Sequence, residues 1–142
     1  MDDEDLVVSR PNPVGAVMAL DAAADLLASA ADKFAMEDYE GAFSDARNSM
    51  RLASSALLLR DGYVAVTLEA TTSYLEERYT GMVPVESWME METAFPGETA
   101  GIMGRLLGAL GKNKRIDRES TEQALAAARS FLRSARAILG VR

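Results

Sequence analysis

The stretch that decides the fold is Ser120–Leu139, STEQALAAARSFLRSARAIL, near the end of the 142-residue chain. Ser120 followed by Gln123 has the form of a capping box, and Gly140 suits the end of a helix. Between them, apolar residues recur at intervals of three and four: Leu125, Ala128, Leu132, Ala135 and Leu139. The stretch therefore predicts a long helix that buries one face against partner helices.

Two long helices are predicted earlier in the chain. The same periodicity runs from about Val14 to Met36, and again from an Asp38 cap to Arg60. The dipeptide Asp61-Gly62 then ends the second helix, because glycine readily adopts the left-handed conformation that follows a helix.

The middle of the chain is less regular. Tyr63–Tyr79 predicts a third helix, although its opening Tyr63–Leu68 is also typical of a short strand. One short helix is expected between Gly81 and Gly97, starting at Pro84. Leucines in 97–111 favour another helix, with four glycines on one face that would let a helix or subunit approach closely. The alternative there is a loop, because each glycine weakens a helix by about 1 kcal/mol relative to alanine.

Together these segments predict an all-α protein, an up-down helical bundle of four to five main helices plus short connecting helices. Residues 1–13 are acidic and end in two prolines, so they are expected to form a flexible leader. Residues 14–142 are then a single domain, long enough to bury a core.

Composition excludes some chemistry. The chain has no histidine and no cysteine, so imidazole catalysis, thiol catalysis and disulfides are excluded. The net charge of −7 argues against a general nucleic-acid coat protein, but leaves room for a local basic patch. We see no apolar run long enough to span a bilayer, and the acidic start is unlike a secretory signal. A cytoplasmic protein with no membrane partner is expected.

The order of the predicted helices and several short motifs in them resemble the HEPN superfamily, small helical domains often found beside minimal nucleotidyltransferases. The resemblance covers most of Ala22–Leu139. Its opening helices match Ala-Ala-Asp-Leu-Leu from Ala23 and the segment Asp38–Phe43. Its helix ending matches Ala53–Gly62, and its terminal helix matches Arg118–Leu125. The resemblance implies a helical bundle, a homodimer, and pairing with a nucleotidyltransferase or binding of nucleotide or RNA.

The departures from that family bear on activity. Its ribonuclease members carry an arginine followed, after four to six residues, by a histidine, whereas this chain has Arg115 and Arg118 with no histidine. A second family histidine falls near 66–68, where this chain also has none. The resemblance therefore implies a non-catalytic member that acts as a partner-binding or nucleotide- or RNA-binding module.

The candidate binding residues are Lys112, Lys114, Arg115 and Arg118, the densest basic run in an acidic chain. Lysine and arginine bind phosphate by charge and hydrogen bonding, so this run is predicted to hold a phosphate group or an RNA backbone. The alternative is a solvated loop whose charges favour the end of the preceding helix.

Two other motifs fail. Gly111-Lys112 is not a phosphate-binding loop, because Leu106 replaces the first glycine and Asn113 replaces the magnesium-binding hydroxyl residue. Carboxylates at 69, 76 and 77 lack the histidines of a di-iron bundle, so no metal and no cofactor is predicted.

Trp88, with Met89 and Met91, either lines an apolar groove for a partner or anchors the short helix in the core. Two alternative functions also stay open. One is a divergent ribonuclease or toxin that uses Arg115, Arg118 and a glutamate in place of histidine. The other is a structural helical adaptor whose likeness to HEPN proteins is convergent.

Overall fold

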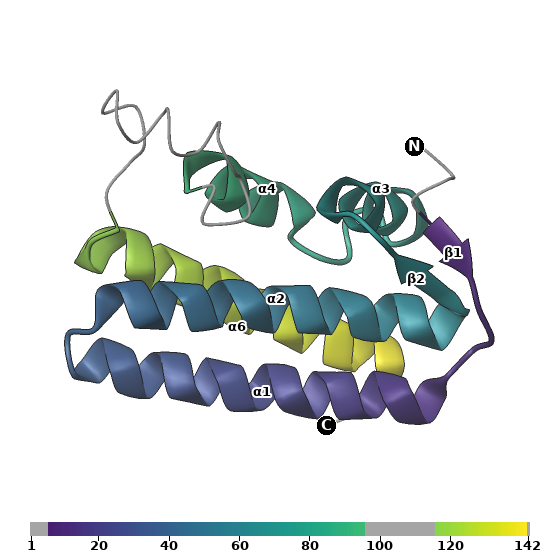
Figure 1. The fold of residues 1–142 in the computed structure, drawn as a ribbon, viewed down its shortest axis with the longest axis horizontal. Helices are drawn as coiled ribbons and strands as arrows, with labels where there is room; N and C mark the ends of the chain where they lie inside the picture. Colours follow the sequence, from purple (N-terminus) through teal and green to yellow (C-terminus); the bar gives the residue numbers. More distant parts are fainter. Residues whose placement is uncertain (1–5, 96–115, 142) are drawn as a thin grey trace.

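The computed structural model describes residues 6–95 and 116–141. The predicted helix over 97–111 and the basic residues Lys112, Lys114 and Arg115 lie outside this part. The predicted all-α bundle is confirmed. Its elements are β1 (Leu6–Val8), α1 (Pro13–Ala35), α2 (Tyr39–Asp61), β2 (Tyr63–Ala65), α3 (Leu68–Arg78), α4 (Val85–Ala94) and α6 (Arg118–Leu139) (Figure 1).

The three long helices α1, α2 and α6 form the body of the bundle. Helices α2 and α6 run in the same direction: the Thr121 hydroxyl lies 3.4 Å from the Tyr39 carbonyl at one end, and at the other an Arg60 Nη1 donates to the Ile138 carbonyl at 2.6 Å. The short helices α3 and α4 carry the chain back along the bundle between them (Figure 1). Together, α3 and α4 therefore take the place of the third helix of an up-down bundle.

Small residues let α1 and α2 pack closely. Ala16, Ala23 and Ala30 are fully buried on α1 at seven-residue intervals. On α2 the Ser49 hydroxyl donates to the Ala23 carbonyl at 2.7 Å, which requires the two backbones to be near one another. Large side chains fill the rest of the core, chiefly Leu20, Phe43, Met50, Leu57, Leu75, Trp88 and Phe131.

Most of the predicted helix ends are confirmed. The Asp38 side chain accepts a hydrogen bond from the Gly41 amide at 3.0 Å, and Gly62 ends α2 with φ 91°. Gly140 likewise ends α6. The predicted start of α6 was wrong, because Asp117 is the cap and its carboxylate accepts from the Ser120 amide at 2.9 Å. Aspartate caps a helix as well as serine does, and the helix begins earlier.

A two-stranded ribbon replaces the start of the predicted third helix, so the strand interpretation of Tyr63–Ala65 is the correct one. Strand β1 pairs with β2 in antiparallel fashion, with Leu6 opposite Ala65 and Val7 opposite Val64. Residues 6–12 of the predicted flexible leader are therefore held against the bundle. The Asn12 amide also donates to the Leu59 carbonyl at 2.8 Å.

Two tyrosines fasten α3 to the end of α2. The hydroxyls of Tyr74 and Tyr79 both donate to the same Oδ2 atom of Asp61, the Tyr74 bond measuring 2.8 Å. Burial, followed by this hydrogen bond, raises the pKa of Tyr79 to about 12 and raises the pKa of Tyr74 as well.

Helix α1 differs from expectation in one respect. It is long and apolar enough, by length and composition, to cross a membrane, because its alanines keep a window of 18 residues apolar with no more than two charges. Only 22% of that window is buried. The core helix of a globular protein and a signal sequence satisfy the same criterion, so the expected absence of a membrane partner stays a prediction.

Candidate functional site

Arg118 is the one predicted binding residue that lies in the described part. It is the first residue of α6, its side chain is 68% exposed, and its Nε donates to Glu122 Oε1 at 3.3 Å. Its guanidinium lies 5.8 Å from the centre of the Phe34 ring on α1. The hydrogen bond to Glu122 raises the pKa of Arg118. This arginine therefore lies on the side of α6 that faces α1.

Three further arginines share that side of α6. Successive residues turn by about 100° around a helix, so the intervals of four and three place Arg129, Arg133 and Arg136 near the line of Arg118. They border a hollow of about 440 Å³ between α1 and α6. Within 6–95 and 116–141, none of the three has a carboxylate at ion-pair distance. We call Arg129, Arg133 and Arg136 the arginine face.

Sequence reasoning missed the arginine face, because its residues look like the polar side of any amphipathic helix. The available signal was charge. After Glu122 the chain carries arginines and no acidic residue to its end.

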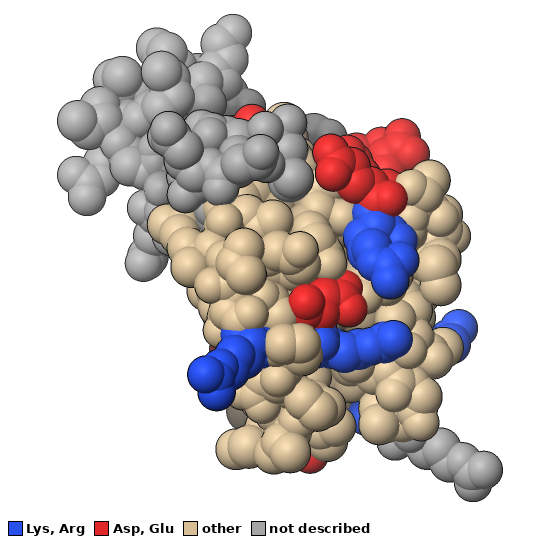
Figure 2. All heavy atoms as spheres, turned by 90° about the vertical axis from the view of Figure 1, so that its right-hand side faces the viewer, with Lys and Arg blue, Asp and Glu red and all other residues tan. Residues whose placement is uncertain are grey.

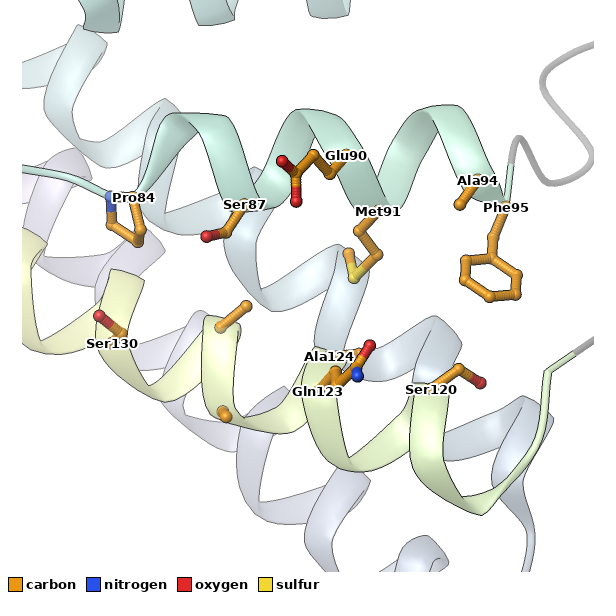
Figure 3. A pocket seen from close by; sticks show the side chains of 12 residues that line it. Pro84, Ser87, Glu90, Met91, Ala94, Phe95, Ser120, Gln123, Ala124 and Ser130 are labelled. Carbon is orange, nitrogen blue, oxygen red and sulfur yellow. The ribbon is translucent and has the colours of Figure 1, made fainter. Parts of the chain in front are cut away.

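The opposite side of α6 borders a groove against α4 (Figure 3). Its volume is about 480 Å³. Met91 and Phe95 project into it from the α4 side, and Gln123 and Ser120 lie across from them on α6 (Figure 3). The lining is completed by Pro84, Ser87, Glu90, Ala94, Ala124, Ala126, Ala127 and Ser130. We call this space the α4–α6 groove.

Alanines keep the groove open. Ala124 and Ala127 stand on α6 where a larger side chain would fill the space. In the core of the bundle, outside the groove lining, the buried Trp88 ring meets Phe131 edge-on with 5.5 Å between ring centres. The interpretation of Trp88 as a core anchor is thereby confirmed.

A buried ion-pair cluster sets the position of α4. Glu92 accepts from the Trp88 indole at 3.1 Å and from Arg51 Nη2 at 3.1 and 3.2 Å. The Arg47 Nε lies 3.7 Å from Glu92 Oε1, and an Arg47 Nη2 donates to the Phe95 carbonyl. Burial lowers the pKa of Arg47. These bonds tie α4 to α2, so the groove on its α6 side has fixed walls.

The chemistry of the groove suits binding better than bond cleavage. Its lining has three serines, one carboxylate (Glu90) and no cation. The Ser120 hydroxyl is already bonded to the Asp117 backbone, and within the described residues no serine of the groove bonds to Glu90. An activated nucleophile needs such a base in hydrogen-bond reach.

The structure does not bring Arg118 into the groove. It lies about half a turn around α6 from Ala127. In the ranges 6–95 and 116–141 no three acidic residues gather into a possible metal site, and this includes Glu69, Glu76 and Glu77.

Comparisons of this chain with protein-family models, with curated proteins and with solved structures give no match. The HEPN resemblance therefore stays a prediction.

Proposed function

We propose that this protein is a non-catalytic binding module that holds a nucleotide-like ligand in the α4–α6 groove. The observation that carries the proposal is the groove itself, a cavity of about 480 Å³ with fixed walls. It borders α6, the helix that follows the basic run 112–118 in the sequence. Cavities of roughly 300–1,000 Å³ are typical of small-molecule sites.

The lining matches the base of such a ligand. Met91 and Phe95 offer an apolar floor for a planar base, and the Ser87 hydroxyl and Gln123 amide offer hydrogen bonds to its edges. The phosphate would lie outside the groove, because Glu90 repels it there. Arg115 is five residues before Ser120, so a chain of at most about 18 Å connects a cation of the basic run to the groove.

The test is calorimetric titration of the full chain with AMP and ADP. Ala127→Leu fills the groove and should weaken binding by roughly tenfold or more, because the new side chain occupies the ligand's space. Ala137→Leu makes the same change in the hollow between α1 and α6, on the other side of α6, and should leave the nucleotide affinity unchanged. Equal affinity in both variants would place the ligand elsewhere.

The same samples distinguish the enzyme alternative. Incubation with RNA should give no cleavage products, because no serine of the α4–α6 groove is hydrogen-bonded to a carboxylate among the described residues. Cleavage that is lost in Arg115→Ala would favour the divergent ribonuclease or toxin instead.

The proposal includes a homodimer, and it keeps a nucleotidyltransferase as the partner that the HEPN resemblance implies. Co-purification with a nucleotidyltransferase encoded beside it tests that pairing. A protein that binds neither nucleotide nor partner would favour the structural adaptor.

A further inference from the structure

The outer surface of α1 is unusually apolar for a helix on the outside of a bundle. Val14 and Met18, in its first two turns, are 70% and 67% exposed, and Val17 beside them is 38% exposed. Figure 2, which looks onto the end of the bundle where α1 begins, shows uncharged residues over most of the described surface. A surface helix normally turns polar residues outward, and contiguous apolar patches mark interaction sites.

The same outer surface carries a regular row of acids. Asp21, Asp25 and Asp32 are all exposed, and intervals of four and seven place them on the side of α1 that also holds Val14 and Met18. Within the part of the chain that the structure describes, none of the three has a cation at ion-pair distance. Their charges are therefore open to a partner.

The arginine face of the neighbouring helix has matching dimensions. Arg129 and Arg136 stand seven positions apart, as Asp25 and Asp32 do, which is about 10 Å along a helix axis, and Arg133 lies between the two arginines. Between it and α1 lies the hollow of about 440 Å³, whose floor is aliphatic: Leu27, Leu132 and Val141. We call this hollow the α1–α6 groove. One chain thus presents an apolar helix with three acids beside an aliphatic groove with three arginines.

We propose that a second copy of this chain covers the α1 surface, with α1 of each protomer docked in the α1–α6 groove of the other. Asp25 and Asp32 then face arginines of the arginine face, and the valines of α1 meet aliphatic side chains. Both complementary surfaces belong to the same chain. A two-fold axis therefore repeats the contact of α1 with the α1–α6 groove once in each direction, and the assembly stops at two chains.

The observations favour a second copy over a polyanion. A nucleic acid or an anionic lipid surface at the arginines would meet the aspartates of α1, which repel phosphate. The floor of the α1–α6 groove also lacks the aromatic rings on which unpaired bases stack. The inference rests on the homodimer within the proposed function and names its interface. The α4–α6 groove is on the other side of α6, so nucleotide binding and dimerisation can fail separately.

The test is the mass of the full chain in solution by analytical ultracentrifugation, over about 1 to 100 µM. The unmodified protein should be a dimer whose dissociation constant rises with salt. The pair Asp25→Arg with Asp32→Arg, and separately Arg133→Asp with Arg136→Asp, should each raise that constant by roughly tenfold or more, because like charges then face each other. The matched control, Glu76→Arg with Glu77→Arg on α3, should leave it unchanged.

Mixing the two reversed proteins is the decisive step. In a mixed pair, arginines on α1 of one chain meet aspartates on α6 of the other. The second contact joins aspartates on α1 to arginines on α6, as in the unmodified dimer. A 1:1 heterodimer should therefore form from two proteins that are monomeric alone, which a folding defect would not allow. The proposal is overturned by an unmodified monomer throughout this range, by a dimer that ignores both reversals, or by failure of the mixture to pair. Binding of the monomer to phosphatidylglycerol vesicles or to a short RNA through this surface would overturn it in favour of that occupant.

Discussion

Glu92→Gln is the sharpest test of how α4 is held against the bundle. The change keeps the size of the side chain and removes its charge. Glu92 is 7% exposed at its side chain and Arg47, its partner, is 11% exposed. Arg47 Nε already has no hydrogen-bond partner among the described residues. The substitution therefore leaves a buried guanidinium without a counter-charge.

The expected loss follows from these contacts. Removing one member of a buried ion pair costs about 3–5 kcal/mol. Glutamine keeps one oxygen to accept from Trp88, and the Arg51 side chain is 34% exposed, so water screens its share of the interaction. We expect the free energy of unfolding to fall by about 2–3 kcal/mol.

Urea denaturation at pH 7 measures that free energy, with tryptophan fluorescence as a readout because Trp88 is the sole tryptophan and touches Glu92. Glu90→Gln, two residues earlier on α4 and exposed, is the matched control and should change stability by less than about 0.5 kcal/mol. A Glu92→Gln protein as stable as the control would refute the role of this cluster.

Three further predictions concern the ends of helices. The pKa of Tyr79 is raised to about 12, above the value near 10 of an unfolded tyrosine, and the pKa of Tyr74 is raised as well. The stability that these two tyrosines contribute is therefore complete below about pH 10 and is lost as the pH rises toward 12. A variant with both Tyr74→Phe and Tyr79→Phe should lose less stability than the unmodified protein over this alkaline range. Asp117→Ala removes the cap of α6 and should cost about 1 kcal/mol in urea denaturation at pH 7. The backbone hydrogen bond from Ser120 lowers the pKa of Asp117, so this loss should be complete above the unfolded value of about 3.9 and shrink as the pH falls below it; a loss that does not depend on pH would argue against the cap. Gly62→Ala should cost more than Gly81→Ala, because both glycines have positive φ but only at Gly62 would a Cβ also press on the leader, 3.1 Å from its nearest atom; equal losses in thermal melts would remove the leader contact.

Local patterns predicted the helices well, because a helix bonds within itself. The Asp38 cap, the Gly62 end and the buried stripe of α6 need no knowledge of distant residues. Pairing of β1 with β2 joins residues almost sixty positions apart, so the leader's strand could not be predicted from its own sequence. The start of α6 was misplaced because Asp117 and Ser120 are both good caps.

The candidate site was harder to predict than the fold. Arg118 was singled out as part of a basic run, but its position around α6 separates it from the groove and aligns it with the arginine face. The α4–α6 groove depends on how far α4 stands from α6, which is set by contacts of Glu92 with α2. The spacing of residues along either helix does not predict the distance between α4 and α6.

The most direct test of the central claim is a titration of ¹⁵N-labelled protein with ADP, followed by NMR. The account predicts saturable shifts at Ser87, Met91, Gln123 and Ala127 in the α4–α6 groove, with ADP recovered unchanged. Shifts confined to the arginine face, no shifts at all, or conversion of the ADP would contradict it.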